Sequence, residues 1–399
     1  MSSLTSHRSS LVFLAVTLLT FLAASSAPTP LYHLYQEGLH FSAGTLTLIF
    51  GVYALSLLAA LLTVGSLSDH LGRRPVIFTA LVLNMLAMLL FINEDSVAWL
   101  IAARTVQGFA TGMATAVLGA ALLDTDRQQG PLVNSVAPLL GMACGAMGSS
   151  VLAEFAPLPT QLIYWTLLAL MLMQALYVWR LPETVDRIPG ALASLRPTLH
   201  VPPQARRALW LSLPVDVAVW AMGGFYLSLA PSLVRAATGS TSNLIGGGLV
   251  AVLTLSGALM IFTLRNRPAS KVLRLGATLL AAGVALILTA VHSASLPLFF
   301  IATLIAGSGF GAGFLGALRS VVPLALPHER AGLMSAFYVL SYLAFCLPSL
   351  LAGNLIRSFG LIVTTDGYGA VLILLALGAL VALLLQDSAK SKAACISVK

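Results

Sequence analysis

The stretch GSLSDHLGRRPVIF, residues 65–78, lies between two long apolar runs and gathers much of the scarce charge of the chain. Asp69, Arg73 and Arg74 fall close together, although only 9% of the 399 residues are charged. Soluble domains carry about 25% charged residues. A short basic segment between two apolar runs of bilayer length is typical of a loop that joins two membrane-spanning helices.

The composition of the whole chain supports a membrane protein. Hydrophobic residues make up 58% of it, which leaves too little polar surface to face water, so the solvent is a lipid bilayer. The net charge of +8 does not indicate nucleic-acid binding, because the basic residues lie in short loops. Cys144 and Cys346 lie in apolar runs and Cys395 lies near the end of the chain, so no disulfide framework is expected.

The apolar runs predict an all-α membrane protein with twelve transmembrane helices. Each run is close to the roughly 20 residues that a helix needs to cross a bilayer, and continuous apolar runs do not suit barrel strands. The expected spans are approximately 10–34, 43–65, 76–93, 97–122, 131–153, 160–180, 208–232, 243–264, 272–292, 296–320, 330–356 and 361–385. The alternative for residues 1–27 is a cleaved secretory signal, which would leave an odd number of spans.

The positions of Lys and Arg predict that both termini are cytoplasmic. With the N-terminus inside, only Arg235 and Arg357 lie in outer loops, and Arg104 lies within a span. All other Lys and Arg residues then fall on the inner side, as the positive-inside rule requires. The expected location is the plasma membrane, which in a bacterium is the inner membrane.

The chain divides into two halves that resemble each other. SAPTPLYHLY ends the first span and LAPSLVRAAT ends the seventh, while GRRP follows the second span and RNRP the eighth. Weak internal symmetry of this kind is typical of a duplicated transporter. We expect two pseudo-symmetric six-helix bundles and a polar linker, with a cytoplasmic tail. Their expected ranges are 1–181 for the first bundle, 182–207 for the linker, 208–387 for the second bundle and 388–399 for the tail.

The opening stretch resembles the signature of the major facilitator superfamily between helices 2 and 3. Its pattern is Gly, any residue, Leu, a small residue, Asp, two further residues, Gly, Arg, and Arg or Lys. The matching residues are Gly65, Leu67, Asp69, Gly72, Arg73 and Arg74. LPET, residues 181–184, also looks typical of this superfamily. The resemblance extends over nearly the whole chain and implies transport by alternating access.

The chemistry of the loop suggests a conformational latch. Gly72 permits a turn with positive φ, and Asp69 and Arg73 can pair at i, i+4. Asp124 and Asp126 are candidate further partners. By resemblance, Asp69 approaches the N-terminus of the eleventh helix, near LPHERAG at 326–332, when the transporter opens outward. The alternative is a positive-inside anchor with incidental acids.

Two further segments resemble motifs of the superfamily. RTVQG, residues 104–108, matches a motif in which the arginine is tied to proton coupling or to an anionic substrate group. Arg104 lies about 10 Å into its span, with Gln107 on a similar face as a cavity candidate; the alternative role of Arg104 is a structural clamp on backbone carbonyls. Gly108 at the end of this motif is a candidate for close helix packing. The fifth span contains three further candidates, Gly141, Gly145 and Gly148.

The glycine spacing in the fifth span is similar to that of the drug:proton antiporter branch. Ala146, however, stands where that branch has proline, which weakens the likeness to antiporters but not to the superfamily. Small residues at this spacing favour close helix packing whatever the function.

Asp216 is the acid expected deepest in a span, about 12 Å from the inner end of the seventh. A carboxylate inside a membrane is a functional candidate, either as a proton carrier or as a counter-charge for a cationic substrate. The first span has no acid that could serve instead. The alternative is a helix that starts later, at Pro214, which would leave Asp216 wet and close to the linker. Arg104 and Asp216 differ in expected depth by roughly 8 Å, which argues against a direct pair.

Aromatic residues are candidates to line a substrate cavity. Trp220 lies one turn after Asp216 and so on the same face. The other candidates are Tyr53, Tyr226 and Tyr342, each of which has packing in the core or contact with lipid as its alternative role.

Other activities find no support in the sequence. GAGFLG at 311–316 matches a dinucleotide-binding pattern but lies inside an apolar run, where close helix packing explains it. The sequence has no phosphate-binding loop motif for ATP and no Cys/His cluster for a metal. We therefore expect no cofactor and no enzymatic activity.

The expected function is secondary active transport, and specifically proton-coupled efflux of small hydrophobic or amphipathic compounds by a monomer. The alternative is proton-coupled uptake of a small metabolite, and a membrane-embedded enzyme is a remote third.

Overall fold

The computed structural model describes residues 2–326 and 328–397, with side chains described for residues 8–326 and 328–386. Met1 of the expected first bundle, Pro327 of the expected latch partner, and Val398 and Lys399 of the expected tail lie outside the described residues. The side chain of Cys395 also lies outside them.

The described chain is helical and contains twelve helices long and apolar enough to cross a membrane, which confirms the predicted fold class. The first bundle consists of α1 (Ser2–Ser26), η1 (Thr29–Leu31), α2 (Tyr32–Leu39), α3 (Ala43–Val64), α4 (Leu67–Leu71), α5 (Arg73–Ile92), α6 (Val97–Thr125), α7 (Gly130–Phe155), α8 (Leu162–Tyr177) and η2 (Val178–Arg180). The linker contains η3 (Ala193–Leu195). The second bundle consists of α9 (Pro203–Ser228), α10 (Ala230–Thr238), α11 (Asn243–Leu264), α12 (Ala269–His292), α13 (Leu296–Val321), η4 (Val322–Leu324), α14 (Arg330–Phe359) and α15 (Leu361–Ser397).

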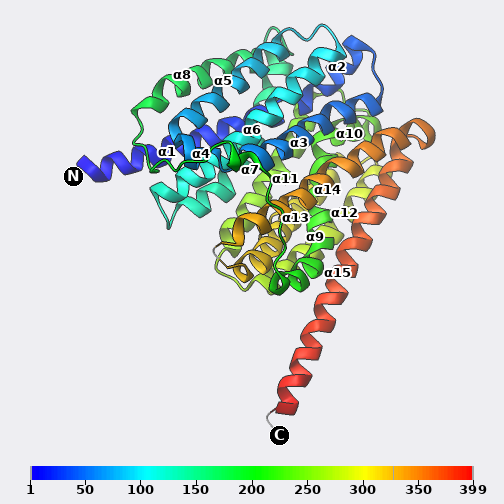
Figure 1. Ribbon diagram of the computed structural model, residues 1–399. Helices are drawn as coiled ribbons and strands as arrows, with labels where there is room; N and C mark the ends of the chain where they lie inside the picture. Colours follow the sequence, from blue (N-terminus) through cyan, green and yellow to red (C-terminus); the bar gives the residue numbers. More distant parts are fainter. Residues whose placement is uncertain (1, 327, 398–399) are drawn as a thin grey trace.

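Two helical bundles lie against each other, joined by the linker. In Figure 1 they converge at the ends that carry α2 and α10, and they diverge toward the ends that carry the linker and the two termini. We call these two sides the far face and the linker face. The loop 65–72 belongs to the linker face, and the loops 93–96 and 293–295 belong to the far face.

The sequence repeats noticed in the two halves form equivalent structures. SAPTPLYHLY closes α1 and forms η1 and α2, while LAPSLVRAAT closes α9 and forms α10. Prolines explain both breaks, because a proline cannot donate a backbone hydrogen bond inside a helix but is well suited to its first turn. Pro30 lies in η1, and Pro231 lies in the first turn of α10.

Helix α9 begins at Pro203, earlier than the expected start near residue 208. Pro202 is extended and Pro203 occupies the first turn, where a missing N–H costs nothing. Pro214, the alternative start, lies inside the helix instead. Asp216 is therefore in the middle of a 26-residue helix rather than at a wet end.

Glycines bring the helices of each bundle into backbone contact. A Cβ at Gly108 or Gly112 of α6 would collide with the carbonyl oxygen of Tyr53 or Leu57 in α3. The second bundle repeats the arrangement between α13 and α11. There, a Cβ at Gly307 or Gly311 would collide with the carbonyl oxygen of Leu253 or Gly257. Glycines spaced by four residues are typical of helices that pack closely in membranes.

The expected packing glycines of α7 behave differently from one another. Gly141 and Gly145 lie against the carbonyl oxygens of Leu19 and Ala23 in α1. Gly148 does not: the nearest atom to a Cβ there would be a methyl group of Ile163, 4.0 Å away. Gly148 therefore faces Ile163 of α8 and not α1, which departs from the expectation.

The two bundles touch each other near the far face. A Cβ at Gly353 of α14 would collide with the Thr47 side chain of α3. A Cβ at Gly247 of α11 would likewise collide with the Ser150 side chain of α7. Thr29 Oγ1 also donates a hydrogen bond to the carbonyl of Leu227, at 2.9 Å. These contacts close the far face in this conformation.

We expect Gly145→Ala to destabilise the protein and Gly148→Ala to leave it unchanged. The added methyl at position 145 would force α1 and α7 apart, and overpacking of this kind costs roughly 1–3 kcal/mol. Thermal unfolding of the two purified variants in one detergent measures the difference. Equal melting temperatures would show that α1 and α7 are not in backbone contact.

Candidate functional site

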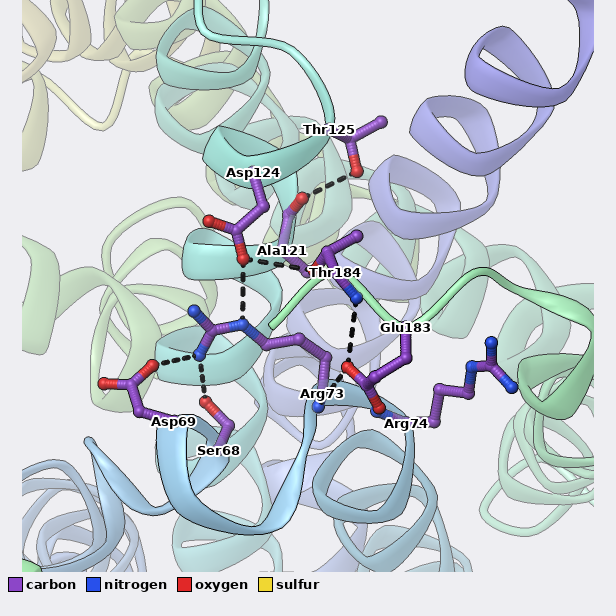
Figure 2. A network of polar contacts seen from close by, with 9 residues as sticks. All are labelled: Ser68, Asp69, Arg73, Arg74, Ala121, Asp124, Thr125, Glu183 and Thr184. Carbon is purple, nitrogen blue, oxygen red and sulfur yellow. Dashed lines mark hydrogen bonds and ion pairs between the residues drawn. The ribbon is translucent and has the colours of Figure 1, made fainter. Parts of the chain in front are cut away.

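Arg73 forms the centre of a polar network on the linker face (Figure 2). Arg73 is buried, with 7% of its surface exposed. Nη1 donates to Asp69 Oδ1 and to Ser68 Oγ, both at 2.6 Å, and Nε donates to Asp124 Oδ2 at 3.0 Å. The guanidinium thus joins the loop after α3 to the end of α6. The structure brings together Asp69, Arg73 and Asp124, as the sequence suggested.

Glu183 completes this network, and its role was not assigned from the sequence. Its carboxylate accepts from the backbone N–H groups of Arg73, at 2.8 Å, and of Arg74, at 3.3 Å. These are the first residues of α5, so the acid caps a helix N-terminus, where the helix dipole favours negative charge. Gly72, with φ of +100°, makes the turn into α5. A Cβ there would also lie 2.7 Å from Glu183 Oε2.

The remaining residues of the signature support this loop. Gly65 follows the last residue of α3, and Leu67 starts α4 and packs against the core. The guanidinium of Arg74 donates to the carbonyl of Trp179 at 3.5 Å. Asp126, the other candidate acid, accepts from the backbone of Gln128 and Gln129 and so shapes the turn between α6 and α7.

The linker lies along the signature loop and reaches the start of α14. Ile188 N–H donates to the carbonyl of Asp69 at 3.3 Å, and Ser66 Oγ donates to the carbonyl of Ser194 at 3.4 Å. Beyond these contacts, His200 N–H donates to the carbonyl of Gly332 in α14 at 3.3 Å. Among the contacts between described residues, the Asp69 side chain binds Arg73 and does not bind α14.

Arg104 is buried in the first bundle, with 1% of its surface exposed. Nη1 donates to the carbonyl of Ser25 at 2.9 Å and to Gln107 Oε1 at 2.6 Å. Nε donates to Tyr32 Oη at 3.0 Å, and Nη2 donates to the same oxygen. The Tyr53 ring lies with its centroid 4.8 Å from the guanidinium carbon. Neutral groups therefore hold this cation, through hydrogen bonds and a cation–π contact.

Gln107 and Tyr53, expected in a substrate cavity, instead belong to the surroundings of Arg104. Gln107 Nε2 donates to the carbonyl of Ala24 at 2.8 Å, so Gln107 and Arg104 together hold the end of α1. This geometry favours the structural-clamp alternative for Arg104. Tyr32 was not singled out from the sequence, although it lies within the repeated segment SAPTPLYHLY.

Asp216 is buried in the second bundle, with 1% of its surface exposed. Ser341 Oγ of α14 lies 2.7 Å from Asp216 Oδ2, while Oδ1 has no hydrogen-bond partner among the described residues. The buried Nε1 of Trp220 interacts with the Asp216 carboxyl group, but it makes no hydrogen bond of ordinary geometry among the described residues. Ionising a carboxyl group inside a membrane span is costly when one of its oxygens has no hydrogen-bond partner.

Aromatic side chains surround Trp220 one turn after Asp216. The centroid of its ring lies 4.8 Å from that of Tyr342, 6.0 Å from that of Phe314 and 5.8 Å from that of Phe345. Across the boundary between the bundles, Phe345 packs against Phe50 of α3, with their centroids 4.9 Å apart. The structure therefore places two of the expected cavity residues, Trp220 and Tyr342, in ring contact with each other, and Trp220 lies one turn along α9 from Asp216.

Tyr226 lies elsewhere in the second bundle. Its hydroxyl forms a hydrogen bond of 2.7 Å with Thr303 Oγ1 in α13, and the side chain is buried. Six residues after Trp220, a helical side chain points to a different face, which explains the separation. No ion pair between described residues joins Arg104 to Asp216, in agreement with the difference in depth.

Glu94 is a further acid, half-buried, that the sequence reasoning missed. It lies in the loop between α5 and α6 on the far face, where Oε2 is buried without a hydrogen-bond partner. Burial raises the pKa of the Glu94 carboxyl to about 7, and contacts with Thr160 and Tyr35 only partly oppose this shift. The neutral acid is therefore favoured below pH 7.

We expect Glu183→Gln to lower the melting temperature by a few degrees. The substitution removes the negative charge that caps α5, and caps of this kind contribute about 0.5–2 kcal/mol. Asp186→Asn, an exposed linker acid three residues later, is the matched control. If both variants melt alike, Glu183 does not cap α5 in the folded protein.

We expect Arg104→Lys to destabilise the first bundle. An ammonium group cannot donate to Ser25, Gln107 and Tyr32 together, because it lacks the planar fork of arginine. Arg319→Lys is the control, since that exposed guanidinium also binds backbone carbonyls, those of Arg265 and Arg267. Thermal unfolding measures both; an unchanged melting temperature for Arg104→Lys would contradict the structural-clamp role.

Solved structures of transporters share this fold. The human organic anion transporter MFSD10 (TETRAN) superposes with a TM-score of 0.68 at 20% identity, over 94% of this chain and 99% of that one. The nucleoside transporter NupG superposes with a TM-score of 0.72 at 13% identity, over the same shares of the two chains. At these identities the likeness concerns the fold.

Sequence comparison reaches the family. The multidrug resistance protein MdtL of Citrobacter koseri is 26% identical over 327 residues, which cover 78% of this chain and 79% of the relative. MdtL of Escherichia coli O6:K15:H31 is 26% identical over 315 residues, or 75% of this chain and 76% of the relative. The family model described as Major Facilitator Superfamily matches residues 12–267, more than half of the chain. The chain therefore belongs to the Major Facilitator Superfamily of membrane transporters, and it is not an enzyme.

Proposed function

We propose that this transporter couples the inward movement of protons to the export of small hydrophobic or amphipathic compounds. It works as a monomer in the plasma membrane, with the linker face toward the cytoplasm. The distribution of Lys and Arg supports this orientation. The distant likeness to MdtL, a multidrug resistance protein, supports export.

The observation that carries the proposal is the buried carboxyl group of Asp216. It lies at the middle of α9, it is in no ion pair with another described residue, and one of its oxygens is unpaired. A carboxylate in such a site is costly unless a proton or a cation accompanies it. Asp216 is therefore suited to take up a proton in one conformation and release it in another.

Ser341 accommodates both protonation states of Asp216. Its hydroxyl lies 2.7 Å from Asp216 Oδ2 and 2.9 Å from the carbonyl of Phe337. The single hydroxyl hydrogen can point to an ionised Asp216. When Asp216 is protonated it donates to Ser341 Oγ, and Ser341 then donates to Phe337. The change of protonation thus alters hydrogen bonding between α9 and α14, a helix that also contacts the first bundle.

The aromatic group around Trp220 supports an apolar substrate. Trp220, Tyr342 and Phe314 form a cluster of rings from three helices of the second bundle, and Trp220 lies one turn along α9 from Asp216. Flat ring faces bind compounds of varied shape, mainly through burial of apolar surface. A substrate bound there would lie within reach of the protonation change.

The energy available from protons is adequate for export. Moving one elementary charge across 100 mV releases about 2.3 kcal/mol, which supports a gradient of roughly 50-fold. The pH difference across the membrane adds to this value.

The direct experiment uses everted membrane vesicles that respiration acidifies. A compound exported with proton exchange dissipates the pH difference when it is added, and a pH-sensitive fluorescent dye reports the change. Apolar compounds toxic to a strain that lacks the gene form the test panel. The proposal is wrong if none dissipates the gradient and the strain instead fails to grow on one nutrient, as proton-coupled uptake requires.

We expect Asp216→Asn to abolish the dissipation while the protein remains inserted and folded. The amide cannot take up a proton, so the coupled step is lost. Asp366→Asn is the matched control, because Asp366 lies in the same bundle, is exposed, and pairs with His292. Full proton exchange in Asp216→Asn would remove this residue from the mechanism.

A further inference from the structure

Glu154 connects the two bundles on the far face. It is an exposed residue in the last turn of α7, in the first bundle. Its Oε2 accepts a hydrogen bond from the backbone N–H of Asn243 at 2.8 Å, and its Oε1 accepts one from Ser242 Oγ at 3.2 Å. Asn243 is the first residue of α11, in the second bundle. The acid of one bundle thus caps a helix of the other.

The start of α11 is a strong partner for this carboxylate. The first N–H groups of a helix have no partner within it, and the helix dipole places partial positive charge there. The N-cap residue Ser242 accepts from Leu244 N–H at 3.3 Å, so it satisfies one of these groups itself. Glu154 supplies the acceptor for Asn243 and adds the negative charge that the N-terminus of a 22-residue helix favours.

Neighbouring polar groups complete this junction. Arg235 at the end of α10 reaches Asn243 Oδ1, at 3.4 Å, and the carbonyl of Thr241, at 3.3 Å. From the first bundle, the His33 side chain interacts with Asn243 and Arg235. The N-terminal region of α11 is therefore held by groups from both halves of the protein.

The same chemistry was expected on the opposite side of the membrane. By resemblance, Asp69 approaches the N-terminus of α14 when the transporter opens outward. Here that contact is absent between described residues, and Glu154 at the start of α11 makes an equivalent contact on the far face. Alternating access requires that each face open while the other closes. Contacts of this kind on the two faces would therefore form in turn.

We propose that Glu154 is a latch that holds the far face closed by capping the N-terminus of α11 across the two bundles. Its exposure makes the latch reversible, because water can replace the carboxylate at the helix end when the bundles separate. Its contacts are separate from those of Asp216, since the two groups lie in different bundles and at different depths, so the opening of the far face is measured whether or not protons drive transport.

The test measures the opening of the far face directly. Spin labels are attached to cysteines at Asn93 and Ser293, exposed positions in far-face loops of the two bundles, after the native cysteines are replaced. Pulsed electron-spin resonance in lipid nanodiscs then gives the populations of short and long distances. Glu154→Gln should raise the ratio of open to closed far face by about twofold to fivefold, as expected for loss of a charge at an exposed helix N-terminus. Glu154→Lys should raise it further.

Asp95→Asn is the matched control. It removes the same charge from the same face of the first bundle, but no hydrogen bond of the Asp95 side chain to the second bundle is found among the described residues. Melting curves identify any variant that fails to fold, and Glu154→Gln, which keeps the shape of the side chain, then decides the test. A distance distribution for Glu154→Gln equal to that of the unaltered protein or of Asp95→Asn would overturn the proposal.

Discussion

Both bundles depend on one kind of contact between helices. In it, a backbone carbonyl oxygen of one helix lies against the Cα of a glycine in its neighbour, where no side chain intervenes. Lipid tails are as apolar as leucine, so burial of apolar side chains does little to drive helices together in a bilayer. Close backbone approach gives van der Waals contact that larger side chains would prevent. Gly108 and Gly112 provide it for α6 on α3, and Gly307 and Gly311 provide it for α13 on α11. The duplication that is weak in the sequence is plain in these contacts.

Polar groups in this chain are few, and they lie where elements must be joined. Arg73 joins the signature loop to α6, and Arg104 joins α6 to the end of α1. Both guanidinium groups use several donors at once, which a planar fork does well and an ammonium group does poorly. Glu183 and Glu154 each occupy a helix N-terminus that would otherwise lack acceptors. Charge therefore serves mainly to fix joints between helices, and Asp216 stands apart because one oxygen of its buried carboxyl group has no hydrogen-bond partner among the described residues.

Much of the fold could be predicted from the sequence, because long apolar runs and short basic loops follow directly from the bilayer. The spans and the pairing of Asp69 and Arg73 at i, i+4 depend on local spacing alone. The start of α9 was misplaced because Pro203 opens the helix, whereas Pro214 is tolerated inside it. Ser341 could not be found, since its contact with Asp216 joins positions 125 residues apart. Tyr226 lies six residues after Trp220 and so on another face of α9, which the periodicity of the helix could have shown from the sequence alone.

The anchored linker has a mechanical consequence. It is bound to the first bundle as far as Ser194 and to the second at His200, so only six steps of the chain run freely between the two anchors. A fully extended chain spans at most about 3.6 Å per residue, or roughly 21 Å over this distance. While both anchors hold, Ser194 and His200 cannot move further apart than this. The linker then acts as a tether that limits how far the two bundles separate on the linker face. Lengthening the linker between Ser194 and His200 would allow a wider opening without changing either bundle.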